Sequence, residues 1–176
     1  GERSSLIFLY APLKLKAAGR LNRELFFHKE VFPAETDLEG TYKFNSYRVT
    51  YVYDWKFSPK FNISVGLTAK IRDAAIKIRS KTGLESEKTN LGFVPILYFK
   101  YEYFFNDNFG FIFEGDALAA PQGRAEDIFT GITFRDFKLK SPVQIKLGYR
   151  ILEGGADNDE VYNFTLINFI VLGITF

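Results

Sequence analysis

Residues 161–176, at the end of the chain, alternate between apolar and more mixed positions. Steps of two back from the last residue give one face that is apolar except for Asn168; it consists of Phe176, Ile174, Leu172, Ile170, Leu166, Phe164 and Tyr162. Successive side chains of a β-strand point to opposite faces, so this period of two predicts a strand with one apolar face. A buried strand of a soluble sandwich and a strand of a membrane barrel both fit the pattern, and the rest of the chain has to decide between them.

Length and composition narrow the class of protein. A chain of 176 residues is expected to form a single domain, residues 1–176. Cysteine is absent, which excludes disulfides and thiolate metal sites, and a net charge of +2 gives no reason to expect a nucleic-acid partner. No run approaches the roughly 18 apolar residues of a membrane helix, but barrel strands need only about 9–11 residues.

Strand-like segments recur along the chain, divided by short and long connectors in alternation. The short connectors carry turn residues, Ser58-Pro59, residues 106–108 and Ser141-Pro142. The long ones are polar or glycine-rich and cover residues 18–40, 81–90, 121–126 and 153–160. Eight segments lie between them. Short turns at one end and long loops at the other predict an all-β fold, an eight-stranded antiparallel up-and-down β-barrel.

The two faces of these segments differ, one apolar and one charged. A soluble barrel with an apolar core and a membrane barrel with an apolar outside both fit this division. The aromatic residues favour the membrane barrel, because they gather beside the short turns and the terminus, as membrane girdles do. They are Tyr53, Trp55, Phe57, Phe61, Tyr101, Tyr103, Phe105, Phe109, Phe111, Phe137 and Phe176. A change of phase between Phe134 and Phe137 predicts a β-bulge.

Taken together, these features resemble the small eight-stranded bacterial outer-membrane β-barrels, the class of the OmpA membrane domain, OmpX and OmpW. Such barrels typically end in phenylalanine after alternating apolar residues, and the assembly machinery reads that signal; the matching residues are Ile170, Leu172, Ile174 and Phe176. The resemblance implies a monomeric transmembrane barrel in the bacterial outer membrane. Its implied partners are membrane lipid, lipopolysaccharide and the barrel assembly machinery.

Charged residues recur on the face that would point into such a barrel. They are Arg48, Asp54, Lys56, Lys70, Arg72, Lys100, Glu102, Glu114, Asp116, Arg135, Lys146 and Arg150. The interior of an eight-stranded barrel is only wide enough for side chains, and buried charges need partners. The pattern predicts an ion-pair network that fills the lumen. A proton or ion path is the alternative, since Glu114 and Asp116 are spaced like paired acid/base carboxylates.

His28, the only histidine, is the one candidate for catalysis. Two families of lipid A-modifying barrel enzymes use an essential histidine. The His-x-Ser-Asn motif of the deacylases is absent, because Lys29 and Glu30 follow His28. The palmitoyltransferases use His, Asp and Ser near the rim, where Asp73 and Ser80 could lie, but no spacing selects these two residues. We therefore predict no catalytic residue.

The long connectors contain charged residues of both signs. Residues 152–160 are acidic and glycine-rich, which suits oxygen ligation of Ca²⁺, but they lack the EF-hand spacing, so we expect a solvated loop and no metal. A basic set at the same end could contact lipopolysaccharide phosphates. It consists of Lys77, Arg79, Lys81, Lys88 and Arg124.

One part of the predicted lumen divides into an apolar and a cationic wall. The apolar residues are Val94, Ile96, Leu118, Ile167 and Phe169, and the cations are Arg48, Lys70, Arg72 and Arg150. Such walls suit an amphiphile with an anionic head, such as a fatty acid or lipid fragment; alternatively these side chains simply fill a closed barrel. We expect a non-enzymatic envelope structural or small-amphiphile-binding protein without a cofactor. The alternatives are a lipid A-modifying enzyme and a narrow channel for small apolar solutes.

Overall fold

The structure is a computed structural model that describes residues 3–120, 123–136, 143–157 and 162–176. Every regular element in these ranges is a strand. The strands are β1 (Ser4–Ala11), β2 (Lys14–Arg20), β3 (Leu25–Phe27), β4 (Glu30–Phe32), β5 (Asp37–Phe57), β6 (Phe61–Ser80), β7 (Glu85–Phe104), β8 (Phe109–Ala120), β9 (Gly123–Asp136), β10 (Val143–Asp157) and β11 (Tyr162–Thr175).

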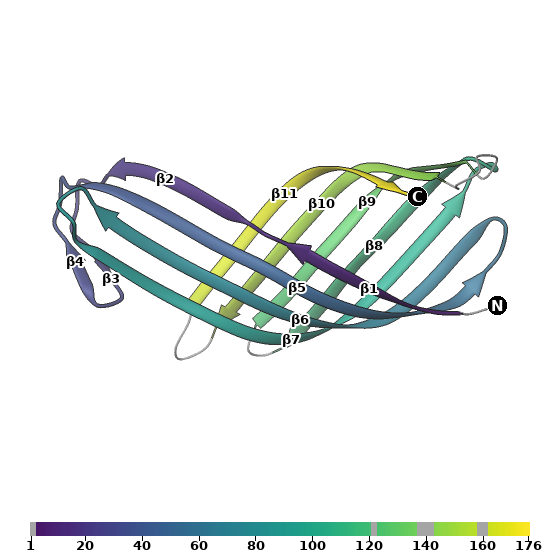
Figure 1. Ribbon diagram of the computed structural model, residues 1–176, viewed down its shortest axis with the longest axis horizontal. Helices are drawn as coiled ribbons and strands as arrows, with labels where there is room; N and C mark the ends of the chain where they lie inside the picture. Colours follow the sequence, from purple (N-terminus) through teal and green to yellow (C-terminus); the bar gives the residue numbers. More distant parts are fainter. Residues whose placement is uncertain (1–2, 121–122, 137–142, 158–161) are drawn as a thin grey trace. The chain divides into compact units, whose positions relative to one another are not determined.

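One antiparallel sheet holds all strands except the β3–β4 hairpin (Figure 1). Its order is β1-β5-β6-β7-β8-β9-β10-β11, with β2 also paired to β5. Apart from β2 and the β3–β4 hairpin, which lie between β1 and β5 in the chain, each strand pairs with the next strand along the chain. This order confirms the prediction of an all-β, eight-stranded antiparallel sheet. In the part of the chain that the structure describes, β1 does not pair with β11, so the sheet is open at these two edges. The predicted closure is not present.

β1 and β2 together form a single interrupted edge strand. The interruption falls at Pro12 and Leu13, and proline has no N–H for a sheet hydrogen bond. Leu13 closes the gap, because its carbonyl accepts a hydrogen bond from Phe44 N and its N–H donates to Asn45 Oδ1. β2 then continues along β5, with Lys14 opposite Lys43. The edge strand therefore stays paired on both sides of the proline.

The chain divides into two compact units. Unit 1 comprises Gly1–Ile7, Thr50–Thr68 and Pro95–Phe176, and unit 2 comprises Phe8–Val49 and Ala69–Val94. Unit 1 contains a part of each of the eight sheet strands and curls strongly into an open half-barrel, in which β8 to β11 run side by side (Figure 1). Unit 2 contains the remaining parts of β1, β5, β6 and β7, with β2 and the β3–β4 hairpin. The prediction of one domain stays a prediction.

The predicted long connectors are mostly strand, which corrects the expected alternation of loop lengths. Only residues 81–84 remain between β6 and β7, where Ser80 Oγ accepts from Leu84 N and Gly83 takes a left-handed φ of 95°. Likewise β9 begins at Gly123, and β10 extends to Asp157. Polar composition suggested loops here, but alternate charged residues pair across antiparallel strands, as Lys77 and Glu85 do. Residues 121–122 and 158–161 lie outside the described residues.

The short turns follow the predicted turn residues. Between β5 and β6, Ser58 Oγ accepts hydrogen bonds from the N–H groups of Lys60 and Phe61. Between β7 and β8, Asn106 Oδ1 accepts from the N–H groups of Asn108 and Phe109. These side chains hold the backbone of the turns in place. The predicted Ser141-Pro142 turn lies outside the described residues.

β9 keeps one phase along its whole length. Its register to β8 and to β10 is continuous, from Gly123 opposite Ala120 to Phe134 opposite Phe109 on one side and from Gly123 opposite Ala156 to Asp136 opposite Val143 on the other. No bulge therefore interrupts residues 123–136. Phe137, the other end of the predicted phase change, lies outside the described residues.

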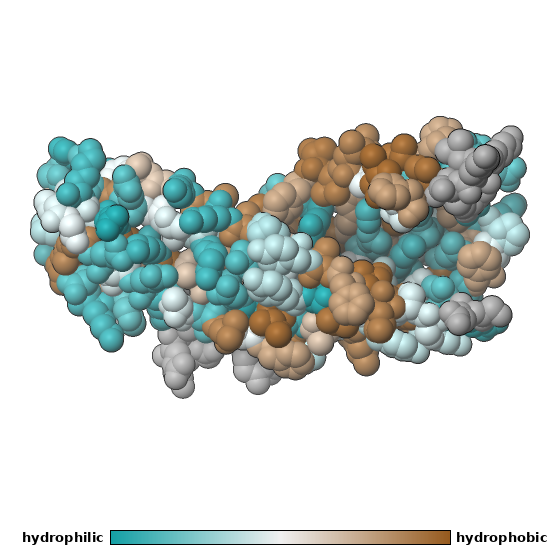
Figure 2. All heavy atoms as spheres, in the orientation of Figure 1, coloured by the Kyte–Doolittle hydropathy of each residue, from teal (hydrophilic) through white to brown (hydrophobic). Residues whose placement is uncertain are grey.

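The two faces of unit 1 differ in polarity, and the shielded face is the more polar one. The shielded face buries polar side chains of Thr50, Ser64, Thr68, Glu102, Asp116, Asp127 and Thr133, together with a few apolar ones such as Ile96 and Ile112. The other face exposes apolar side chains, among them Trp55, Phe57, Leu67, Leu97, Phe105, Leu147, Ile170, Leu172 and Phe176. Figure 2 shows apolar side chains gathered over β10 and β11, with hydrophilic ones inside the curl. Among the residues described, no helix is long and apolar enough to cross a membrane.

Glycines on the shielded face of unit 1 make room for aromatic rings. A Cβ added to Gly131 or Gly148 would lie 2.9 Å from Phe129 Cζ, and Gly131 and Gly148 face each other across β9 and β10. A Cβ at Gly110 would lie 2.8 Å from the ring of Phe104. Each ring therefore occupies space that a side chain at the neighbouring glycine would need.

Candidate functional site

The shielded face of unit 1 carries a ladder of ion pairs. Lys146 pairs with Glu114, and Arg150 pairs with Asp127 through two parallel hydrogen bonds, Nε to Oδ1 at 2.5 Å and Nη2 to Oδ2 at 2.6 Å. The Asp127 side chain is only 6% exposed, so its charge depends on the guanidinium for compensation.

A second group lies nearer the short turns. Lys100 Nζ lies 2.9 Å from Glu102, and Gln144 donates through Nε2 both to Glu102 at 2.9 Å and to Thr133 Oγ1 at 2.8 Å. Glu102 comes from β7, Thr133 from β9 and Gln144 from β10. These hydrogen bonds therefore link β7, β9 and β10 on the shielded face. Each carboxylate oxygen of Glu102 has a polar partner.

Hydroxyl groups satisfy the remaining acids of this face. Thr68 Oγ1 donates to Asp116 at 2.5 Å and lies 2.8 Å from Thr50 Oγ1, and Ser64 Oγ donates to Asp54 at 2.7 Å. Each of the five acids named on this face thus has a hydrogen-bonding partner, and for Glu102, Glu114 and Asp127 that partner includes a cation. Such an interior is suited to hold the sheet together.

The charged residues that were predicted to fill the lumen lie in several parts of the structure. Asp54, Lys100, Glu102, Glu114, Asp116, Lys146 and Arg150 lie on the shielded face of unit 1. Arg135 lies at the short-turn end, where its Nε donates to Asp107 O at 3.0 Å and its guanidinium lies 3.3 Å from the Phe104 ring centroid. Lys56 is exposed and lies near Trp55. Arg48, Lys70 and Arg72 belong to unit 2.

Asp127 is the main residue that sequence reasoning missed. It directly follows the predicted connector 121–126, and it is a buried residue of β9. The alternation of Asp127, Phe129, Gly131, Thr133 and Arg135 along one face was the signal that could have found it. Gln144 and the threonines were not predicted, because a pattern of charges does not select neutral polar side chains.

The same face of β5, β6 and β7 in unit 2 is formed by even-numbered residues and carries a cationic group. Arg48 and Lys70 are buried; Arg48 Nε donates to Ser46 Oγ at 3.0 Å, and Lys70 Nζ lies 5.6 Å from the Phe44 ring centroid. Arg72 donates through Nη2 to Asn90 Oδ1 at 2.7 Å. We call Arg48, Lys70, Arg72 and Asn90 the unit 2 cationic cluster.

On the odd-numbered face of unit 2, cations and carboxylates pair with each other. Lys43 pairs with Asp73 at 2.8 Å, and Lys77 and Arg79 both pair with Glu85. Lys77 and Arg79, which were predicted to contact lipopolysaccharide, thus have an acidic partner within the chain. In unit 1, Arg124 likewise pairs with Glu153.

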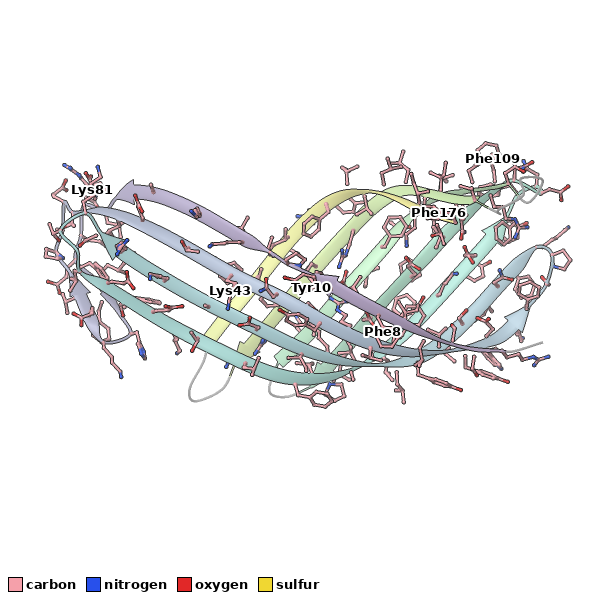
Figure 3. The ribbon with its side chains drawn as sticks, viewed as in Figure 1. Phe8, Tyr10, Lys43, Lys81, Phe109 and Phe176 are labelled. Carbon is pink, nitrogen blue, oxygen red and sulfur yellow. The ribbon has the colours of Figure 1, made fainter. Side chains whose placement is uncertain are left out.

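Asp37 is the centre of a surface triad in unit 2. Arg20 Nε lies 2.8 Å from its carboxylate and Lys81 Nζ lies 2.9 Å from it; Lys81 is at the tip of the unit (Figure 3). These two hydrogen bonds, first that of Arg20, lower the pKa of Asp37 to about 2.

The predicted apolar wall is divided between the units. Val94 belongs to unit 2, whereas Ile96, Leu118, Ile167 and Phe169 belong to unit 1. Ile96 is buried and the other three of unit 1 are half-buried. Arg150, expected in the cationic wall, is held by Asp127 and lies 5.7 Å from the Phe169 ring centroid. This contact mixes the two predicted walls.

His28 lies in the turn of the β3–β4 hairpin, with a left-handed φ of 56° and an exposed side chain. Asp73 and Ser80 are engaged elsewhere, Asp73 by Lys43 on the odd-numbered face and Ser80 in the turn after β6. Within the described ranges, no group of three or more acidic or histidine side chains is arranged to hold a metal ion. Residues 158–161 of the acidic connector lie outside these ranges.

The proposed assembly signal lies on the free edge strand of unit 1. Ile170, Leu172, Ile174 and Phe176 are between 58% and 90% exposed. Phe176 lies toward the end of unit 1 where Phe109 begins β8 (Figure 3). An exposed apolar edge strand is a template for pairing with another strand.

Comparison of the chain with family models, with curated proteins and with solved structures found no match.

Proposed function

We propose that this chain is an integral outer-membrane β-barrel with a non-enzymatic role, either structural in the envelope or binding a small amphiphile. The observation that carries the proposal is the inversion of faces in unit 1. Large apolar side chains are exposed, from Leu147 at 55% to Phe176 at 90%, while Thr68 and Glu102 are buried at 2% and 3%. A soluble protein would lose free energy by this arrangement, whereas hydrocarbon around the sheet makes it favourable.

Aromatic positions support a membrane boundary at the short-turn end. Tyr53, Trp55, Phe57, Tyr101, Tyr103, Phe105, Phe109 and Phe176 all have exposed side chains near these turns or the last residue. Tyrosine and tryptophan rings favour the headgroup level of a bilayer. The aliphatic residues further along the strands, such as Leu67, Leu97 and Leu147, would then face the acyl chains.

Closure of the sheet completes the proposal. Hydrocarbon does not tolerate free N–H and C=O groups, so β1 and β11 would pair with each other in the bilayer. β1 and β11 run in opposite directions in an eight-strand meander, which suits an antiparallel seam. The exposed residues of β11 would be read by the barrel assembly machinery before closure, and membrane lipid and lipopolysaccharide would surround the finished barrel.

Refolding tests the proposal. Urea-unfolded protein is diluted into buffer alone or into dimyristoyl phosphatidylcholine vesicles, and far-UV circular dichroism, protease protection and gel migration before and after heating are measured. We expect β-structure, protection and a heat-dependent change of migration only with vesicles. A stable, monodisperse folded protein in buffer alone would contradict a membrane role.

A further inference from the structure

We propose that copies of this chain associate side by side in the membrane, with β2 of one copy pairing to residues 85–91 of β7 in the next copy. We call β2 and residues 85–91 the two edges of unit 2. The proposal rests on the proposed membrane function, because the bilayer gives all copies a common orientation. It departs from the monomer that the resemblance to small outer-membrane barrels implies.

The first argument is that the sheet of unit 2 ends in two edges without a partner strand. β2 pairs with β5 on one side, and within the described residues no strand pairs with its other side. The ladder between β7 and β8 runs from Leu97 to Phe104, and β8 ends at Ala120, so in the same ranges only β6 pairs with residues 85–91. Figure 1 shows β2 and β7 on opposite sides of β5 and β6. Free edges of this kind are templates for a further strand.

The second argument is the direction of the two edge strands. β2 is antiparallel to β5, and short turns join β5 to β6 and β6 to β7, so β2 and β7 run in opposite directions. Copies that are related by rotation about the membrane normal keep their strand directions relative to the bilayer. β2 of one copy would therefore meet residues 85–91 of the next copy in antiparallel orientation. The sheet would continue from one chain into the other, a head-to-tail contact that builds rings or rows.

The third argument is the charge of the β2 edge. The even-numbered residues of β2 lie on the odd-numbered face of unit 2, because Lys14 is opposite Lys43 and Arg20 pairs with Asp37. β2 adds to this face three cations and no acid; they are Lys14, Lys16 and Arg20. Lys14 and Lys16 are exposed, and neither forms an ion pair within the described residues.

The β7 edge gives the same face the opposite charge. Its charged side chains there are Glu85 and Glu87, both exposed. Glu85 is already paired with Lys77 and Arg79, so Glu87 is the carboxylate that a second chain would meet. Lysine on an edge strand often prevents association, but here the other edge carries an acid, and opposite charges across an antiparallel pair attract.

The bilayer would also set the two edges at the same height. Tyr10 and Phe93 are exposed aromatic residues on the strands that carry the edges, at 59% and 68%, and Tyr10 stacks on Tyr47 of the odd-numbered face. The chain runs toward the tip from Tyr10 and away from the tip before Phe93, so Lys16 and Glu87 each lie six residues nearer the tip than these rings. With both rings at the level of the lipid, Lys16 of one copy would face Glu87 of the next.

A disulfide test uses the absence of cysteine from the chain. Lys16→Cys, with an affinity tag, is refolded together with untagged Glu87→Cys in dimyristoyl phosphatidylcholine vesicles, and the mixture is oxidised. Arg79→Cys replaces Lys16→Cys in the control, because Arg79 is exposed on the same face but lies in the central strand β6. We expect at least five times more tagged heterodimer from the first mixture than from the control, and more than the homodimer of either variant alone.

Reversal of charge tests the contact without cysteines. Association is measured by energy transfer between copies in vesicles, with donor and acceptor dyes on the terminal amine. Lys16→Glu or Glu87→Lys should each weaken association at least threefold, because like charges would then meet. The chain that carries both changes should associate within twofold of the unaltered protein, because opposite charges meet again between neighbouring copies.

Two results would overturn the proposal while leaving the membrane function intact. The first is folded protein that forms no more heterodimer than the Arg79→Cys control. The second is a double reversal that associates as weakly as either single one. Circular dichroism, protease protection and heat-dependent gel migration report folding in vesicles separately, so a failure of membrane folding, which would overturn both proposals, is distinguished from a failure of association alone.

Discussion

At the scale of single residues, Asp127 illustrates how the interior of unit 1 is held. Its carboxylate is buried and meets the Arg150 guanidinium through two hydrogen bonds. Asp127→Asn removes the charge and leaves Arg150 facing a neutral amide, so we expect a loss of about 3–5 kcal/mol in unfolding free energy. Urea unfolding in vesicles measures it. Asp107→Asn, in an exposed turn, is the control and should change stability by less than about 0.5 kcal/mol; equal effects of both variants would show that the pair is not structural.

The ion pairs of Asp37 should make part of the stability of unit 2 depend on pH. Its pKa falls from the ordinary value of 3.8 to about 2 because Arg20 and Lys81 donate to it. A lowered pKa in the folded state means that the triad stabilises unit 2 above about pH 4 and that this contribution disappears as the pH falls through about 2. We expect the Asp37 carboxyl resonance to titrate in NMR with a midpoint near 2, and Arg20→Gln to move that midpoint upward. A midpoint of 3.8 in the unaltered protein would mean that the triad does not form.

At the scale of elements, variants of neighbouring residues in β10 can show which face of the sheet would contact lipid. Leu147 is 55% exposed, while its neighbour Lys146 pairs with Glu114 on the shielded face. Leu147→Arg near the middle of the bilayer should cost about 2–4 kcal/mol in vesicle refolding. Leu147→Phe, which stays apolar, is the control and should change stability little. If Leu147→Arg is neutral while Lys146→Leu abolishes folding, the assignment of the faces is reversed.

The glycines of β9 and β10 make a further prediction about packing. A Cβ at Gly148 would lie 2.1 Å from Thr130 O and 2.9 Å from Phe129 Cζ, so strands and ring would both have to move. Gly148→Ala should therefore cost about 1–3 kcal/mol. Gly154→Ala in the same strand has only Arg124 O near, at 3.9 Å, and should be close to neutral. Equal unfolding midpoints of the two variants in urea would show that the Phe129 ring does not lie over Gly148.

At the scale of the whole molecule, the two open edges predict a seam between β1 and β11. The chain has no cysteine, so an introduced pair provides the only thiols. Leu6→Cys is combined in turn with Ile170→Cys, Leu172→Cys and Ile174→Cys, all exposed residues of the edge strands. We expect at least one pair to form an intramolecular disulfide after oxidation in vesicles and none in urea. Disulfides only between copies would indicate edge-to-edge association in place of closure.

The sequence by itself determined the strands and the division of their faces. Alternation is a local property, because the geometry of each residue sends its side chain to one side or the other. The period of two in residues 161–176, and the order of eight strands, were therefore predictable. The full lengths of β5, β6 and β7 were not predictable. Segments with charged residues such as Lys77 and Glu85 have the composition of a loop, and they form strands because these residues pair across the sheet.

Only the tertiary structure decided which face is shielded and which charges meet. The direction in which unit 1 curls makes the polar face the inner one, and a strand pattern is the same for either direction. Lys146 and Glu114 lie on β10 and β8, with β9 between them, so their pairing follows from register and curvature across three strands. Arg150 was predicted to take part in an ion-pair network without a named partner, and the register of β9 brings Asp127 to it. Partners of this kind depend on distances between strands, which no local pattern contains.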